Sequence, residues 1–263
     1  MIRLSISNIA WDASHDREVC GMMKELSYSG LEIAPTRIFP KTPYDRLKEA
    51  GEWAGNLKKE YGLSVPSMQS IWYGRKEALF GSDEERRILT DYTMKAIDFA
   101  EAIGCRNLVF GCPRNRNVPD GADSGSAVSF FRELGEYAKE HKTVLAMEAN
   151  PPIYNTNYIN DTVGALDLIE EVGSAGFMLN LDTGTMIENG EQVSVLEGRG
   201  HLINHVHISE PGLKTIEKRE LHKDLFGFLK ECGYDRYVSI EMGKQDDLKK
   251  IENTMIYLDS LIS

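Results

Sequence analysis

The sequence predicts an α/β fold, a single (β/α)8 barrel, and three observations support this. Short apolar runs alternate with longer segments of helical periodicity along the whole chain, a pattern typical of strand–helix units around a parallel sheet. Eight such runs can be counted, and titratable residues stand at the C-terminal ends of several of them. The chain has 263 residues, 41% of them hydrophobic, which is enough for one barrel core. We therefore expect one domain over residues 1–263.

The predicted elements follow one another in regular order. Helix 83–103 is the clearest, with Asp83 at its N-cap, acids in its first turn and Gly104 after its end. Segment 187–200 has only a weak helical pattern. The predicted strands occupy residues 2–7, 30–34, 64–69, 107–110, 143–148, 177–182, 203–209 and 237–242, and the predicted helices occupy residues 17–29, 44–61, 84–103, 126–141, 162–172, 219–232 and 247–261.

An open, doubly wound sheet is the alternative arrangement of these elements. The positions of the polar residues favour the barrel, because the C-terminal ends of barrel strands converge on one mouth where working groups gather. In addition, no glycine-rich phosphate loop follows the first strand, where a dinucleotide-binding sheet would need one.

Composition excludes several classes of partner. A net charge of -11 makes binding to a nucleic-acid backbone unfavourable, so we expect no nucleic-acid partner. The N-terminus lacks the features of a signal peptide and no apolar run could span a bilayer, which favours a cytoplasmic protein without a membrane partner. The scattered cysteines suggest neither a disulfide framework nor a zinc clip: Cys20, Cys105, Cys112 and Cys232.

Three predicted strands end in carboxylates, Glu148, Asp182 and Glu241, and a fourth carries His207. A carboxylate at the end of an apolar strand is costly to bury unless it finds an opposite charge or a hydrogen-bond partner. Any one of these acids could cap a loop, but all four groups lie at the ends of consecutive strands. Carboxylate oxygens and one imidazole suit a hard to borderline ion. We therefore predict one divalent metal ion, Mn²⁺ in preference to Mg²⁺, Co²⁺ or Zn²⁺.

Other polar residues near strand ends are candidates for substrate binding. Arg114 and Arg116 lie in the loop after the fourth strand, where two guanidinium groups suggest an anionic substrate group or, alternatively, a solvated loop paired with local acids. Gln69, Asn150 and Lys244 also follow strand ends and could contact substrate hydroxyl groups.

Two further groups of residues have open roles. His205 and His207 lie two apart on one strand and share a face, so His205 is expected to touch substrate, to orient a ligand, or to be a core histidine. Glu32 could reach the site or pair with a buried charge. Aromatic residues after the first and third strands could cover a sugar or serve packing alone: Trp11, Trp72 and Tyr73.

With these residues the chain resembles the xylose isomerase-like barrel superfamily, and within it the sugar isomerases and epimerases that include ketose 3-epimerases and hydroxypyruvate isomerases. The resemblance implies that Glu148, Asp182, His207 and Glu241 are the metal ligands. It also implies that Glu148 and Glu241 act as base and acid on opposite sides of a substrate carbon. The matching positions run over nearly the whole chain: Asn8, Gly30-Leu-Glu-Ile33, Glu148, Asp182-Thr-Gly184, His205-Val-His-Ile208 and Ser239-Ile-Glu-Met242.

The function implied is a metal-dependent isomerase or epimerase that acts on a small sugar, sugar phosphate or sugar acid by proton transfer through a metal-bound enediolate. A homodimer is also implied. Two positions depart from the epimerase pattern: Thr185 replaces a frequent His and Leu213 replaces an Arg, both of which hold substrate oxygens in the resembling enzymes. These two departures support a non-catalytic sugar-binding barrel as one alternative. A dehydratase or lyase is another, because the same metal and acid pair could drive loss of a β-hydroxyl group. A DNA endonuclease is disfavoured by the negative charge and by the small number of histidines, six.

Overall fold

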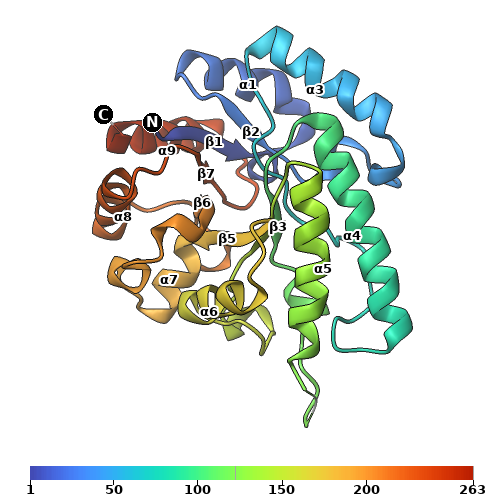
Figure 1. Cartoon of the computed structure of the whole chain (residues 1–263). Coiled ribbons are helices and arrows are strands. Elements are labelled where there is room, and N and C mark those ends of the chain that lie inside the picture. The colour runs from blue at the N-terminus through green and yellow to red at the C-terminus, as the bar shows by residue number, and fades with distance from the viewer. Residues whose placement is uncertain (122, 263) are drawn as a thin grey trace.

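The computed structural model describes residues 1–121 and 123–262 and has a curled parallel sheet with helices around its outside (Figure 1). The sheet has seven strands in the order β2-β1-β7-β6-β5-β4-β3, and every pairing is parallel. The strands are β1 (Arg3–Ser7), β2 (Gly30–Glu32), β3 (Leu108–Phe110), β4 (Leu145–Met147), β5 (Phe177–Asp182), β6 (Ile203–Ile208) and β7 (Tyr237–Ile240).

The third of the eight predicted strands is not a regular strand, so that part of the prediction is wrong. This segment forms only isolated bridges, to β2 on one side and to β3 on the other. The Ser64 carbonyl accepts a hydrogen bond from the Leu31 N–H, and the Ser67 carbonyl accepts one from the Ile33 N–H. The two acceptors are three residues apart and the two donors only two, so the third segment has one extra residue relative to the β2 side. Pro66 lies between the two acceptors and has no N–H to donate, which prevents a continuous ladder. The segment nevertheless connects the two edges of the sheet.

Nine helices are found in the described part of the chain, and each predicted helix is confirmed to within a few residues. The weakly patterned segment contains the end of α7 and one short 3-10 turn, Val193–Leu196, and a second turn, Gly200–Leu202, begins at its last residue. The helices are α1 (Asp16–Glu25), α2 (Pro35–Ile38), α3 (Leu47–Tyr61), α4 (Asp83–Ile103), α5 (Ser126–Glu140), α6 (Thr162–Val172), α7 (Thr183–Asn189), α8 (Glu220–Glu231) and α9 (Leu248–Ile262). None of the helices described is long and apolar enough to cross a lipid bilayer.

Alternation along the strands sorts apolar from polar side chains. In β5, Phe177 stacks on Phe131 of α5 with 4.8 Å between ring centroids, so this face of the strand meets the helices. Asn180 and Asp182 lie on the other face, inside the curled sheet, and both are buried. In the same way β1 buries Ser5 inside. The interior of the sheet is therefore polar, and the apolar core lies between the sheet and its helices.

The N-cap of α4 is Ser82 and not the predicted Asp83, because Ser82 has extended backbone geometry and makes a capping box with Glu85. The Ser82 hydroxyl accepts from the Glu85 backbone N–H at 3.2 Å, and the Glu85 carboxylate accepts from the Ser82 N–H at 2.9 Å. The backbone N–H groups of Ser82 and Glu85, which have no partner within the helix, are both hydrogen-bonded in this way.

Replacing Ser82 with alanine should lower the free energy of unfolding by about 1 kcal/mol, because a helix donor loses its acceptor. The matched control is Ser124→Ala, since Ser124 is exposed and its hydroxyl has no hydrogen-bond partner among the described residues. Urea denaturation measures both variants, and equal stability of the two would contradict the capping assignment.

Candidate metal and substrate site

The four predicted metal ligands lie together at the carboxyl end of the sheet. Glu148 directly follows β4, Asp182 ends β5, His207 lies near the end of β6 and Glu241 directly follows β7. These strands are consecutive neighbours in the sheet, so their ends meet at one edge. One donor atom from each residue lies within 4.8 Å of the others, and all four side chains are buried.

His207 lies at the centre of this cluster. Its Nδ1 is 2.9 Å from Glu148 Oε1 and 3.2 Å from Glu241 Oε2. Its Nε2 is 2.9 Å from Glu32 Oε2, on the side away from the cluster. When Nε2–H donates to Glu32, Nδ1 presents its lone pair to the space between the carboxylates, as a metal ligand must. Glu32 therefore fixes the orientation of a proposed ligand.

Electrostatics inside the cluster favour a cation. Burial raises the pKa of Glu148, Asp182 and Glu241, and in each case a neighbouring carboxylate raises that pKa further. The pKa of Asp182 rises to about 6. Burial also lowers the pKa of His207, but Glu32 and the ligand glutamates outweigh burial and raise it. Three buried carboxylates repel one another unless positive charge lies between them. The donor set thus fits a divalent metal ion of the predicted kind.

Asp182 is held by hydroxyl groups that the sequence did not identify as partners. Its Oδ2 accepts from the Thr185 backbone N–H at 2.8 Å and lies 2.9 Å from the Thr185 hydroxyl. Ser209 donates its hydroxyl to Oδ1. Thr185, which stands where the epimerases often carry a substrate-binding histidine, therefore orients a proposed ligand in this chain.

Asn180 is a site residue that sequence reasoning missed. Its Nδ2 donates to Glu148 Oε1 at 2.8 Å, and its Oδ1 accepts from Asn107 at 3.3 Å. Asn107 Oδ1 in turn accepts from Asn204 at 2.7 Å, and Asn204 Oδ1 accepts from Arg236 at 2.6 Å. This asparagine chain holds Glu148 from inside the sheet. The signal was Asn180's position two residues before Asp182 on the same face of β5.

A pocket with a volume of about 170 Å³ opens over the cluster. Gln69 and Asn150, two of the candidates for substrate binding, line it, and so does Leu213, which supplies an apolar wall where the resembling epimerases have arginine. A Cβ at Gly111 would come within 2.9 Å of Glu148 Oε2, so glycine leaves room for the carboxylate there. The other lining residues are Ser70, Val109, Cys112, Pro113, Glu148, Tyr154, Asp182, Ser209 and Glu241.

Arg116 does not lie in the opening. Its side chain is fully buried, and it donates to the Glu148 carbonyl at 2.9 Å and to Asn150 Oδ1 at 3.0 Å. Burial lowers its pKa to about 10. Arg116 therefore holds the segment that follows β4 in place, and a direct role in anion binding does not fit this position.

Lys244 and His205 also lie outside the pocket. Lys244 is exposed and pairs with Asp12 at 3.0 Å. His205 Nε2 is 3.1 Å from Glu32 Oε2, and its ring borders a different pocket at the opposite end of the strands. Neither placement supports the predicted contact with substrate.

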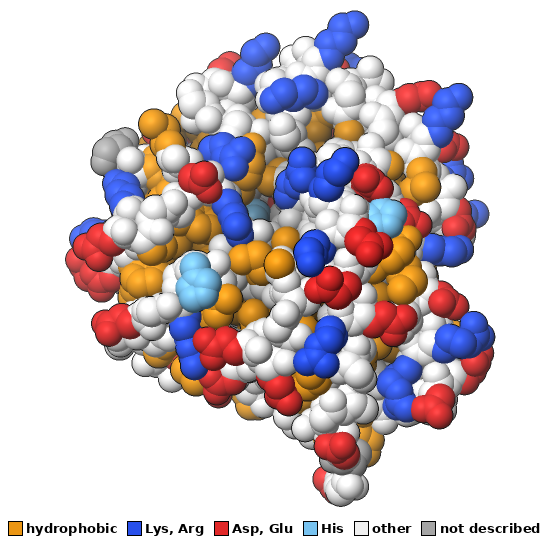
Figure 2. All heavy atoms as spheres, viewed as in Figure 1, with side chains coloured by type: hydrophobic (Ala, Val, Ile, Leu, Met, Phe, Trp, Pro, Cys, Tyr) orange, Lys and Arg blue, Asp and Glu red, His pale blue; other side chains and the backbone are white. Residues whose placement is uncertain are grey.

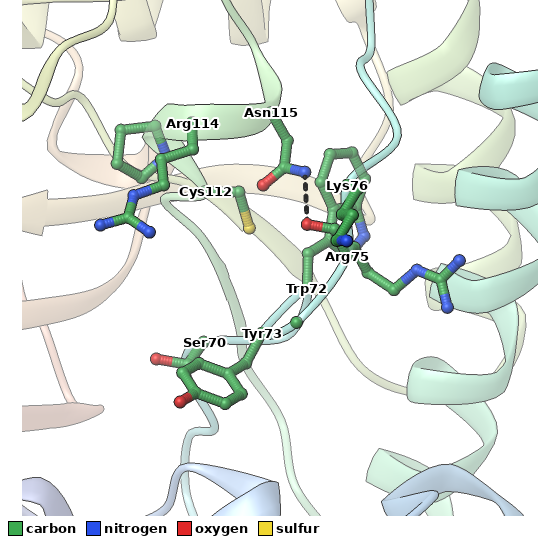
Figure 3. Close-up of a pocket in the computed structure, with 10 residues that line it drawn as sticks. Ser70, Trp72, Tyr73, Arg75, Lys76, Cys112, Arg114 and Asn115 are labelled. Atoms are coloured by element: carbon green, nitrogen blue, oxygen red, sulfur yellow. Dashed lines mark hydrogen bonds between the residues drawn. The ribbon is translucent and has the colours of Figure 1, made fainter.

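Arg114 lines a second, larger pocket of about 590 Å³ beside the first (Figure 3). The two pockets share Ser70, Cys112 and Pro113. Figure 3 shows Arg114 and Tyr73 on different sides of this space. Tyr73 is 71% exposed and free to contact a ligand. Trp72 also lines this pocket, although it is 2% exposed, whereas Trp11 is buried outside both pockets.

A comparison with known protein families covers most of the chain. A family model described as xylose isomerase-like TIM barrel matches residues 21–261. The chain belongs to this family. This confirms the resemblance stated from the sequence.

Individual relatives extend the comparison. L-ribulose 3-epimerase from Methylomonas sp. (strain DH-1) is 24% identical over 254 residues, which cover 93% of this chain and 85% of the relative. The crystal structure of D-psicose 3-epimerase with D-tagatose from Clostridium cellulolyticum H10 has a TM-score of 0.77 at 14% identity and covers 99% of both chains. A structure of IOLI protein with a binding zinc atom has a TM-score of 0.70 at 16% identity and covers 99% of this chain and 98% of its own. These two structures share the fold.

Replacing Arg116 with leucine should lower the free energy of unfolding by about 3 kcal/mol, because two buried acceptors lose a charged donor. Arg114→Leu is the matched control in the same loop. Arg114 is exposed, so its loss should change stability by no more than about 0.5 kcal/mol. Chemical denaturation measures both, and similar effects of the two substitutions would contradict the structural role of Arg116.

Proposed function

We propose that this protein is a divalent-metal-dependent sugar epimerase or isomerase. The observation that carries the proposal is the group of three buried carboxylates and one imidazole whose donor atoms lie within 4.8 Å of one another beneath a pocket. Membership of the family and similarity to ketose 3-epimerases support it.

The metal would be held by Glu148, Asp182, His207 Nδ1 and Glu241. When bound, it supplies Lewis acidity, which stabilises negative charge on neighbouring substrate oxygens and makes an adjacent C–H more acidic. Mn²⁺ is our first choice, because mixed oxygen and imidazole donors suit it. The ion present in the cell depends on supply as well as on these ligands.

Glu148 and Glu241 are proposed to move the proton. One carboxylate removes the hydrogen from a carbon next to the substrate carbonyl, and the other returns a proton to the same carbon or its neighbour. Burial raises the pKa of both groups, which makes each carboxylate a stronger base than an exposed glutamate. Asn180 donates to Glu148 Oε1 and would keep that carboxylate aimed at the substrate.

The substrate is proposed to be a small sugar or a sugar carrying an anionic group. Gln69 and Asn150 line the pocket over the cluster and present amide groups to substrate hydroxyls. Arg114 and Lys76 line the adjoining pocket, where a carboxylate or phosphate on the substrate would meet them. Leu213 removes one polar contact of the resembling epimerases, so specificity is expected to differ from theirs.

The first test is deuterium uptake from D₂O into ketoses, aldoses, sugar phosphates and sugar acids, with Mn²⁺ present. Glu241→Gln should reduce exchange by about 10³-fold or more, because a ligand and a proton-transfer group are lost together. Glu197→Gln, at an exposed position, is the control and should exchange at the normal rate.

Product analysis separates the outcomes. An epimer or isomer with deuterium next to the carbonyl supports the proposal. Release of water with a new carbonyl or double bond would identify a dehydratase instead, and tight sugar binding without exchange would identify a binding protein. Full activity of Glu241→Gln would overturn the proposed roles of the glutamates.

Arg114→Ala should raise KM for anionic substrates about tenfold or more and leave kcat nearly unchanged, because Arg114 would bind a group remote from the reacting carbon. Steady-state kinetics with a neutral sugar is the internal control. An unchanged KM for every anionic substrate would remove Arg114 from the binding site.

A further inference from the structure

A second pocket lies at the opposite end of the strands from the metal cluster. It has a volume of about 340 Å³, within the range of small-molecule sites. Arg3 begins β1, Arg236 directly precedes β7, and Arg106 and Lys142 precede β3 and β4, so the N-terminal ends of four strands contribute to it. We call it the basal pocket. It shares no lining residue with the pocket over the metal cluster.

The lining of the basal pocket is strongly basic. Arg3, Arg106, Lys139, Lys142 and Arg236 line it, and no aspartate or glutamate does, although the chain as a whole carries a net charge of -11. Figure 2 shows Lys and Arg side chains gathered around the middle of the visible face, over the strands at the centre of Figure 1. Like charges gathered around one hollow repel one another and focus a positive potential within it.

Charged residues at the N-terminal face of a barrel usually serve stability through ion pairs. That explanation does not fit here. Among the residues the structure describes, Lys139 pairs with Glu136, but no acid lies within ion-pair distance of Arg3, Arg106, Lys142 or Arg236. Four cations of this pocket thus lack a counter-charge from the protein.

Neutral hydrogen bonds fix the three guanidinium groups in place. Arg3 donates to the Asp235 carbonyl at 3.0 Å, Arg106 to the Lys142 carbonyl at 2.8 Å, and Arg236 to Asn204 Oδ1 at 2.6 Å. Each bond uses one terminal nitrogen of its guanidinium group and leaves further N–H groups for a ligand. Pre-positioned guanidinium groups bind phosphate and carboxylate with little loss of side-chain freedom.

A buried hydroxyl supplies an independent observation. Thr143 is 3% exposed and lines the basal pocket, and its Oγ1 has no hydrogen-bond partner among the described residues. Buried hydroxyl groups in proteins are usually hydrogen-bonded. The oxygen has less than 1 Å² of exposed surface, so it would donate to an oxyanion in the pocket once the Thr143 side chain turned toward it.

We propose that the basal pocket binds a small phosphate-bearing anion, either free phosphate or a phosphate ester. Guanidinium and ammonium donors around one hollow match the three or four oxygens of a phosphate group. The site is separate from the proposed catalytic site, so the proposal does not depend on the sugar epimerase function.

Isothermal titration calorimetry at low ionic strength tests the proposal, with inorganic phosphate and glycerol 3-phosphate as probes. Lys142→Gln is the test variant, because the Lys142 side chain has no ion-pair partner within the described residues. Lys59→Gln removes the same charge from an exposed position on α3 and is the control. We expect saturable binding of one probe, weakened about tenfold by Lys142→Gln and unchanged by Lys59→Gln.

The two probes distinguish the sources of the phosphate group. Tighter binding of inorganic phosphate would identify free phosphate as the ligand, and tighter binding of glycerol 3-phosphate would identify an ester. Phosphate bound at the metal cluster would be insensitive to Lys142→Gln, so equal affinities of the two variants would overturn the proposal. Absence of saturable binding of both probes to the unaltered protein would overturn it as well.

Discussion

The burial of three carboxylates around one imidazole is the constraint on which the rest of the structure depends. Such a group is unfavourable without positive charge and without hydrogen bonds to its outer atoms. The fold supplies these hydrogen bonds: His207 donates to Glu32, Asn180 donates to Glu148, and Ser209 donates to Asp182. For this reason the interior of the sheet is polar, and the apolar core lies outside it, against the helices.

The two ends of the sheet differ in charge. Acids gather at the carboxyl ends of the strands, around His207, whereas arginines and a lysine gather at the amino ends. Three asparagines connect these ends by an unbroken series of hydrogen bonds from Arg236 to Glu148. A parallel sheet allows this separation, because every strand begins at one end and finishes at the other.

Much of this could be predicted from the sequence, because a carboxylate that ends an apolar strand is visible in the pattern. Glu148, Asp182 and Glu241 lie together as expected, and the helices follow their apolar periodicity. Local backbone irregularity was harder to predict. Pro66 interrupts the third strand. In the loop after β3, Arg114 lies within the 3-10 turn Pro113–Asn115 and is exposed, whereas Arg116 directly follows this turn and is buried.

The sequence pattern also did not show toward which end of the sheet a side chain in mid-strand lies. His205 and His207 were expected to share a face, which left a substrate contact, a ligand-orienting role and a core position all open for His205. Two residues of strand advance about 6.6 Å, however, and that distance moves His205 toward the basal pocket while His207 stays with the carboxylates. Asn180 was missed because it is a neutral residue in mid-strand. Its place two residues before Asp182 puts it on the site's face of β5, but only the fold shows that it reaches Glu148 on the neighbouring strand.

The most direct measurement is the anomalous diffraction signal of Mn²⁺ in crystals of the unaltered protein. The account predicts one strong peak with Glu148, Asp182, His207 Nδ1 and Glu241 as its protein ligands, at about 2.0–2.3 Å, with further coordination positions open toward the pocket. A strong peak elsewhere, or no peak within the cluster at saturating Mn²⁺, would contradict the metal site and with it the proposed chemistry.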